Sequence, residues 1–290
     1  MKNPEEARVI EVVRLPIGTF CIDANDIVGK QLKSAGSWEP WLSAFYNKVV
    51  QRDWVCIDAG ANIGVHAMQL GTKCKKVYAF EPQKLIYNHL CANTLFNNLD
   101  FTIENIRKGL GDKKSTEQLW DYKHEIIPNM NGIVNWGGTG IENNEGNPYN
   151  YNPDEIREHD QIQVVTLDSY NFKRCDLIKI DVQGYEFKVF NGGVKLLKNQ
   201  KPIILLENNN KVLGKELENN IKAKNYLYDL GYEIYRIILP HTFASSDDCI
   251  CIHPDNPFYH YSKTAFSNVE DCFEGPNADK YPIKVVKEEK

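Results

Sequence analysis

The run Asp58-Ala59-Gly60-Ala61-Asn62-Ile63-Gly64 follows directly on the apolar stretch Trp54-Val55-Cys56-Ile57. A short apolar run that leads through a glycine-containing loop into a helical pattern is typical of a buried parallel strand that turns into a helix. In sheets of this kind, ligands bind at the carboxyl ends of the strands, where glycine lets the backbone approach them closely. The loop therefore predicts a ligand site at the edge of an α/β sheet.

The rest of the chain repeats this alternation of short apolar strands and helical patterns. Besides the strand at 54–58, strands are predicted at 76–80, 101–103, 176–180, 202–206, 232–239 and 249–252, with helices at 63–71, 82–98 and 216–230. Alternating strands and helices favour a mainly parallel sheet with helices on both faces. We therefore predict an α/β fold with a doubly wound, mainly parallel, seven-stranded Rossmann-like sheet.

The chain is predicted to divide into three segments. Residues 1–50 form an N-terminal lead-in with a helix near 41–50, residues 51–255 form the main domain, and residues 256–290 form a C-terminal arm. Residues 121–160 are rich in Asn, Gly and Tyr and have no clear period. Such a stretch predicts an insertion, either a substrate-binding lid or a mobile loop.

Composition argues against several classes of partner. The formal net charge is −5 over 290 residues, so no basic field favours a nucleic acid or an anionic membrane. No apolar run approaches the roughly 20 residues of a membrane span, and residues 1–14 lack the apolar core of a secretory signal. Eight scattered cysteines indicate reduced thiols rather than a disulfide framework. We therefore expect a cytoplasmic protein without nucleic-acid or membrane partners, and the oligomeric state stays open.

Two acids near the glycine loop indicate which cofactor binds there. Glu81 ends the second predicted strand, where a carboxylate can accept hydrogen bonds from both ribose hydroxyls of a nucleoside. Asp58 would repel a pyrophosphate, and the loop lacks the Gly-x-Gly-x-x-Gly pattern of dinucleotide sites. An acidic loop suits the positive sulfonium and ammonium of S-adenosylmethionine. We predict that cofactor, bound by Asp58, Gly60, Asn62, Glu81 and Pro82; a plain tight turn is the alternative.

Several stretches of the chain resemble the FkbM-type methyltransferase family. They lie at 57–64, 79–82, 165–170, 177–186 and 202–207. The Lys-Ile-Asp-Val-x-Gly-x-Glu run at 179–186 is specific when it follows the Gly-Ala-Asn loop, although Gln183 stands where the family usually has Glu. The resemblance implies a methyltransferase sheet and S-adenosylmethionine-dependent O-methylation of a sugar, a glycan or another small metabolite.

Candidate catalytic residues follow two of the predicted strands. Asp181 comes directly after the strand at 176–180, over the expected cofactor crevice, where it could act as a general base, contribute to cofactor binding or bind a metal. A helix-capping role is the alternative. Glu207 and Asn208 end the next strand, and with Asp181 they could hold Mg²⁺, Mn²⁺ or Ca²⁺. Alternatively, Glu207 only caps the sheet or contacts the substrate.

Other polar residues near these motifs have structural interpretations. Lys179 alternates with apolar neighbours, so we expect it to point to the opposite face of the sheet in a structural role. Glu186 is expected in the first turn of a helix, and His66 on the face of the helix after the loop. The segment Trp38-Glu39-Pro40-Trp41 could close over the cofactor, but anchoring of the N-terminal segment by its two tryptophans is favoured.

Three functions are compatible with these motifs. An O-methyltransferase for small molecules or glycans is predicted, with the insertion and its Trp136 helping to choose the acceptor. An RNA 2′-O-methyltransferase would need a basic groove and a catalytic lysine, whereas here the fifth strand ends in Glu207. A non-catalytic cofactor-binding module is the third possibility. The joint presence of Asp58, Glu81 and Asp181 argues against it.

Overall fold

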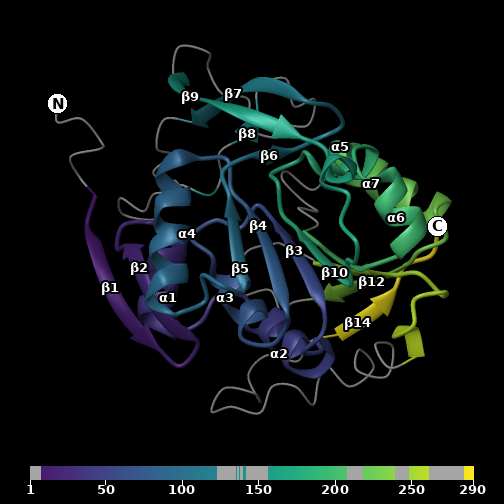
Figure 1. Cartoon of the computed structure of the whole chain (residues 1–290), viewed down its shortest axis with the longest axis horizontal. Coiled ribbons are helices and arrows are strands. Elements are labelled where there is room, and N and C mark those ends of the chain that lie inside the picture. The colour runs from purple at the N-terminus through teal and green to yellow at the C-terminus, as the bar shows by residue number, and fades with distance from the viewer. Residues whose placement is uncertain are drawn as a thin grey trace.

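The computed structural model describes residues 8–122, 135, 137, 140–141, 156–207, 218–238, 248–260 and 284–290. The strands of its main sheet are β3 (Val55–Ala59), β4 (Lys76–Phe80), β5 (Ile103–Ile106), β10 (Leu177–Ile180), β11 (Ile203–Leu206), β12 (Glu233–Ile238), β13 (Cys249–Ile252) and β14 (Lys284–Lys287). Their order is β14-β12-β13-β11-β10-β3-β4-β5 (Figure 1). The five strands from β11 to β5 are parallel, which confirms the predicted fold class.

Three antiparallel strands complete one side of this sheet. β13 pairs antiparallel with β11, β12 with β13, and β14 with β12. β14 is an eighth strand beyond the seven predicted, so part of the C-terminal segment joins the sheet edge. Strand β5 begins at Ile103 rather than near residue 101, and the Phe101 side chain is 90% exposed.

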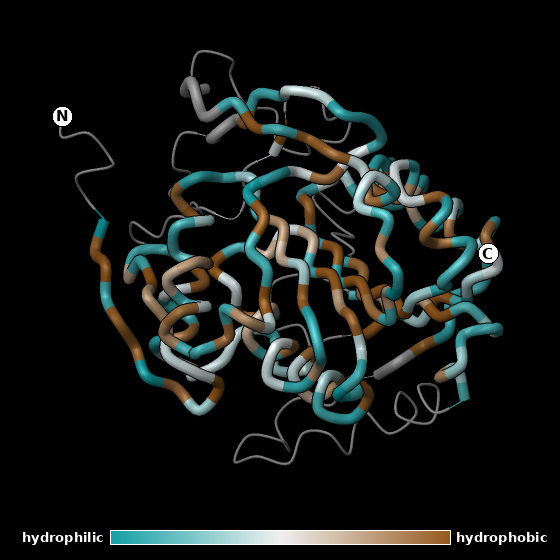
Figure 2. Tube along the Cα trace, in the orientation of Figure 1, coloured by the Kyte–Doolittle hydropathy of each residue, from teal (hydrophilic) through white to brown (hydrophobic). Residues whose placement is uncertain are grey.

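Two apolar cores cover the two faces of the sheet, and the strands between them are strongly hydrophobic in Figure 2. On one face, odd-numbered positions of β10 and β11 such as Leu177 and Leu205 join residues of α2 (Pro40–Val49), α3 (Val65–Gly71) and α4 (Lys84–Phe96). On the other face, Ile178 and Ile204 pack with residues of α5 (Glu186–Asn191), α6 (Val194–Gln200) and α7 (Glu218–Asp229). The period-2 alternation of strands therefore divides the sheet residues between the two cores.

The N-terminal segment contains more structure than the predicted helix near 41–50, which is α2. It also forms a hairpin of β1 (Ile10–Leu15) and β2 (Gly18–Asp23), followed by α1 (Ile27–Ala35). Two asparagines at the end of α4 accept hydrogen bonds from β2: Asn93 from the Cys21 amide at 2.6 Å, and Asn97, the C-cap of the helix, from the Thr19 amide at 2.9 Å. These long-range contacts attach the hairpin to the main domain.

A second sheet has the order β6-β9-β7-β8, with β6 (Gly109–Leu110), β7 (Ser115–Tyr122), β8 (Gly140–Ile141) and β9 (Ile156–Val165). It includes the described ends of the predicted 121–160 insertion, so these parts are strands that the aperiodic sequence did not predict. Trp136 lies outside the described residues. None of the helices in the described part of the chain is both long and apolar enough to span a membrane.

Candidate functional site

The glycine loop joins the ends of three parallel strands. The amides of Gly60 and Ala61 both donate to the Phe80 carbonyl at the end of β4, at 3.0 and 2.9 Å. Gly60 has a φ of 79°, and a Cβ atom there would lie 1.7 Å from the Asp181 carbonyl oxygen after β10. Only glycine combines this left-handed conformation with such a close approach. The structure thus explains the glycine by its close approach to the Asp181 backbone, and the predicted approach of Gly60 to a ligand stays a prediction.

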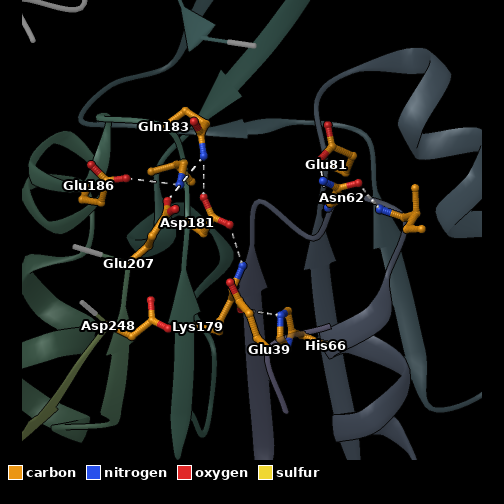
Figure 3. Close-up of polar contacts among 12 residues, drawn as sticks. Glu39, Asn62, His66, Glu81, Lys179, Asp181, Gln183, Glu186, Glu207 and Asp248 are labelled. Carbon is orange, nitrogen blue, oxygen red and sulfur yellow. Dashed lines mark hydrogen bonds and ion pairs between the residues drawn. The ribbon is translucent and has the colours of Figure 1, made fainter. Parts of the chain in front are cut away.

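Glu81 lies beside this loop with its carboxylate held by two backbone amides. Its Oε2 accepts from the amide of Asn62, which lies beside it in Figure 3, at 3.0 Å. Its Oε1 accepts from the Gln83 amide at 2.8 Å. Burial raises the pKa of Glu81 to about 7. Since a carboxylate oxygen can accept two hydrogen bonds, each oxygen retains capacity for a ribose hydroxyl. The structure brings Asn62, Glu81 and the loop together as the sequence predicts.

A pocket opens over these residues and encloses roughly 650 Å³ of empty space, part of it continuous with solvent. Its lining includes the predicted cofactor residues Gly60, Asn62, Glu81, Pro82 and Asp181, but not the fully buried Asp58. The sequence did not indicate the other lining residues, which include Lys108, Leu110, Leu119, Gly137, Gly140, Ile141, Val182 and Tyr185. Described parts of the 121–160 segment thus lie over the predicted cofactor residues. Its predicted role in acceptor choice stays a prediction.

Asp181 lies at the carboxyl end of β10 and is held by two neighbours. Lys179 Nζ lies 3.1 Å from Asp181 Oδ2, and Gln183 Nε2 donates to Asp181 Oδ1 at 2.9 Å. The same Gln183 nitrogen lies 3.4 Å from Glu207 Oε2, so the amide bridges the two carboxyl groups (Figure 3). Asp181 and Glu207 are therefore neighbours, as expected for the ends of adjacent strands.

Lys179 contacts Asp181, which the alternation along its strand did not indicate. Its side chain does point away from Ile178 and Ile180, but the face it reaches carries a buried polar cluster at this end of the sheet. In register, Lys179 pairs with Asp58 of β3, whose side chain lies on the same face. The sequence signal that could have identified Lys179 is a charge in the middle of a fully buried strand.

The charges of this cluster shift one another's pKa values. Burial alone would raise the pKa of Asp181, but the Lys179 ammonium and the neighbouring hydrogen bonds hold it below its ordinary range. Burial, together with the adjacent Asp181 charge, raises the pKa of Glu207 well above its ordinary value. The carboxylates around Lys179 outweigh the effect of its burial and raise its pKa. The surroundings therefore favour the ionised form of Asp181 and disfavour ionisation of Glu207.

The predicted metal site does not fit this donor set. Both oxygens of Asp181 face hydrogen-bond donors, and one of these is the positively charged ammonium of Lys179, which would repel a divalent cation. Across the described ranges of the chain, no group of three or more His, Cys, Asp and Glu side chains is arranged to hold a metal ion. Asn208, the third predicted ligand, lies outside those ranges. The structure therefore does not support the predicted metal.

A second, smaller cavity lies on the other side of Asp181. It is lined by Glu39, Leu42, Lys179, Asp181, Leu205, Leu206, Glu207 and Asp248. The Asp248 carboxylate accepts a hydrogen bond from Trp41 Nε1 at 2.7 Å, which gives the buried Trp41 an anchoring role. Neither Glu39 nor Asp248 was predicted as a site residue, because both reach the cavity from segments distant in sequence.

Asp58 and Glu186 support the two loops of the site from within the core. Asp58 is fully buried, its pKa is raised by burial, and neither of its oxygens has a hydrogen-bond partner among the described residues. The Lys179 charge, which lies on the same face of the sheet, opposes this increase and favours the ionised carboxylate. Glu186 lies at the start of α5, and its Oε1 accepts from the amides of Val182 and Gly184 at 3.2 and 3.1 Å.

The family to which the chain belongs can now be stated. Residues 58–234, more than half of the chain, match the family model described as the methyltransferase FkbM domain. The chain therefore belongs to the FkbM methyltransferase family. No curated protein matches it in sequence.

Solved structures similar to this chain are distant in sequence. The methyltransferase FkbM from Methylobacillus flagellatus is 15% identical with a TM-score of 0.45, and the match covers 73% of this chain and 50% of that one. The chain thus spans about half the length of that protein. An rRNA methylase from Streptococcus thermophilus is 12% identical (TM-score 0.42, covering 72% and 91%). TYW2 from M. jannaschii, solved in complex with AdoMet, is 13% identical (TM-score 0.42, covering 84% of each chain).

Proposed function

We propose that this methyltransferase uses S-adenosylmethionine to methylate a hydroxyl group of a sugar, a glycan or another small metabolite. One observation carries the proposal: Asp181 lines both cavities, the pocket that contains Glu81 and the acid-lined cavity that contains Glu207. A carboxylate between a cofactor pocket and a second polar cavity is well placed to meet an acceptor hydroxyl beside the transferable methyl group.

The residues around the first pocket fit S-adenosylmethionine. Glu81 can accept the two ribose hydroxyls, while Leu110, Val182 and Tyr185 offer apolar surface for a base. When bound, this cofactor supplies a methyl group activated by an adjacent sulfonium.

The protein itself has one chemical task in this reaction, to take a proton from the acceptor hydroxyl. Asp181 accepts a hydrogen bond from the acceptor hydroxyl and takes its proton as the oxygen–carbon bond forms and the carbon–sulfur bond breaks, with the electron pair passing to sulfur. Asp181 has a depressed pKa and is a weak base towards a free alcohol. However, the hydroxyl proton becomes strongly acidic as its oxygen is alkylated, so a late transfer to the ionised carboxylate is favourable. Positioning of the hydroxyl supplies much of the remaining acceleration.

The second cavity supports a hydroxyl-bearing acceptor over a nucleic acid. Four of its lining residues are acids, Glu39, Asp181, Glu207 and Asp248, and one is a lysine that is paired with Asp181. Carboxylates accept hydrogen bonds from hydroxyls but repel phosphates, on which most protein contacts to RNA depend. An RNA 2′-O-methyltransferase stays the second candidate, because a ribose also presents a hydroxyl.

An acceptor screen tests the proposal. The protein would be incubated with S-adenosylmethionine and a panel of free sugars, methyl glycosides, oligosaccharides and short RNAs, with S-adenosylhomocysteine formation as the readout. We expect turnover with at least one sugar or glycoside. Turnover with RNA alone, together with salt-dependent RNA binding, would select the second candidate. Cofactor binding without turnover of any member would instead indicate a non-catalytic module.

The cofactor assignment makes a separate prediction. Replacing Glu81 with alanine should weaken S-adenosylmethionine binding by about 1–3 kcal/mol, because charged hydrogen bonds to the ribose are lost. Isothermal titration calorimetry would measure this, with Glu104→Ala as the control, since the Glu104 side chain is 51% exposed on β5. Equal affinities of the Glu81 variant and the parent would refute the assignment, and tight binding of NAD would refute the choice of cofactor.

A further inference from the structure

The N-terminal hairpin has one open edge. The hairpin is a separate sheet of β1 and β2, and β1 lies at the outer left of Figure 1. The Ala24 amide donates to the Val9 carbonyl at 2.7 Å, so the odd-numbered residues of β1 direct their backbone groups at β2. Because these directions alternate along an antiparallel strand, the amides and carbonyls of Ile10, Val12 and Arg14 point away from β2. Within the described part of the chain, no other strand pairs with this edge.

The opposite edge of the hairpin is covered by side chains of α4. Besides accepting from the Thr19 amide, Asn97 donates through Nδ2 to the Thr19 carbonyl at 2.8 Å. Asn93 accepts from the Cys21 amide, and His89 Nδ1 lies 2.9 Å from the Cys21 carbonyl. These side chains take the place of a neighbouring strand along β2, which protects that edge against further pairing. The fold therefore protects β2 and leaves β1 exposed.

The open edge also carries exposed apolar side chains. Val9, Ile10 and Val12 are 45%, 49% and 57% exposed, whereas Val13 and Leu15 pack against the core. Unpaired backbone groups flanked by exposed hydrophobic side chains form a template on which another strand can pair. Clustered exposed hydrophobic residues are also typical of protein–protein contact surfaces. The chemistry of this edge thus fits a partner that supplies a β-strand.

We propose that β1 is a dimerisation strand, which pairs antiparallel with β1 of a second copy of the chain about a two-fold axis at Val12. In this register Val12 pairs with Val12 of the second copy, and Ile10 pairs with its Arg14. The outward amides and carbonyls of all three residues then have partners. The two hairpins become one continuous sheet with the order β2-β1-β1-β2.

The sequence of the strand favours this register over its neighbours. A shift that pairs Ile10 with Pro16 would lose a hydrogen bond, because proline has no amide hydrogen. A shift in the other direction would place Arg8 opposite Arg14, and like charges directly opposite each other are destabilising. In the proposed register Arg14 lies opposite the uncharged Ile10, and the next position across the sheet is the acid Asp23. The charges of the two copies are therefore complementary.

Symmetry favours a second copy over a foreign strand. Two copies that meet through the same surface use both open edges at once, so the assembly closes as a dimer. A foreign strand would cover β1 but would leave its own far edge unpaired. The proposal concerns assembly alone and does not depend on the acceptor or the cofactor.

The variant Val12→Pro tests the pairing. Proline removes the Val12 amide hydrogen, which points to the open edge, and so leaves the hydrogen bonds between β1 and β2 in place. Sedimentation equilibrium of the full chain over a concentration series would measure the mass. We expect the parent to approach twice the 33.3 kDa of one chain, and Val12→Pro to stay at 33.3 kDa. The matched control is Val12→Thr, which keeps the amide and the branched Cβ and should remain a dimer.

The measured masses can overturn the proposal in two ways. A parent protein that stays at the mass of one chain at every concentration would refute self-pairing. A Val12→Pro variant that is still dimeric, with an unchanged circular dichroism spectrum, would place the interface elsewhere. If Val12→Pro does not fold, Val12→Lys replaces it, because it keeps the backbone and sets two ammonium groups opposite each other at the two-fold axis. We expect that variant to be monomeric, and a dimer would refute the proposal equally.

Discussion

The variant Asp181→Asn is expected to bind S-adenosylmethionine with near-normal affinity while its methyl-transfer step slows by about 10²–10⁴-fold. Asparagine keeps the size and the contact with Gln183, but it cannot take the proton of the acceptor hydroxyl. It also leaves the Lys179 ammonium without its closest carboxylate, 3.1 Å away. Single-turnover kinetics with saturating cofactor would isolate the chemical step from binding and product release.

Chelation provides the control for this experiment. The donor set around Asp181 includes a lysine ammonium, so the activity of the parent protein should withstand EDTA. Loss of activity in EDTA that Mg²⁺, Mn²⁺ or Ca²⁺ restores would reverse our conclusion about the metal. A near-normal rate for Asp181→Asn would exclude the proton-accepting role and leave positioning as the main source of catalysis.

The variant Lys179→Met is expected to lose about 3–5 kcal/mol of unfolding free energy at neutral pH, the typical cost of removing one partner from a buried ion pair. The Lys179 side chain is 6% exposed and that of Asp181 27%, so water can screen the remaining charge only in part. Methionine has similar length and apolar character, which limits the contribution of lost packing. Urea denaturation monitored by circular dichroism would measure the difference.

The loss of stability in Lys179→Met should depend on pH, and its direction follows from the pKa of Asp181. Asp181 has a pKa held below its ordinary value by Lys179, so the pair stabilises the fold above the unfolded pKa of the carboxyl and loses that effect in acid. The difference between Lys179→Met and the parent should therefore shrink as the pH falls below about 4. Lys179→Arg, which keeps the charge, should retain part of the stability. Equal stability of Lys179→Met and the parent at pH 7 would contradict the electrostatic role of Lys179.

Local sequence patterns were enough to predict most of the candidate functional site. The run from Asp58 to Gly64 and the acids Glu81, Asp181 and Glu207 each come directly after a short apolar strand. The carboxyl ends of neighbouring parallel strands lie at one edge of a sheet, so their positions in sequence were enough to bring them together. The shift of β5 and the missed β1–β2 hairpin have a different cause. Those strands are partly exposed, and their apolar pattern is correspondingly weak.

The electrostatic character of the site could not be inferred in the same way. We predicted a structural role for Lys179 from the period-2 alternation of its strand. This alternation indicates which face of the sheet a side chain points to, but not which residues cover that face. Whether helices there present apolar or ionisable groups depends on segments far away in the chain. The metal prediction finds no support for the same reason, since it counted the oxygen ligands of Asp181 and Glu207 without the Lys179 ammonium that lies 3.1 Å from Asp181.

The sequence by itself determined the parallel sheet, the glycine loop and the acids at its strand ends, because these depend on periodicity and on residues that are close in the chain. Only the tertiary structure placed Glu39 and Asp248 beside Asp181. The hydrogen bond that anchors Asp248 spans 207 residues, from Trp41 near the start of the chain. Contacts of such separation follow from how helices and loops pack on the two faces of the sheet, which no local pattern records.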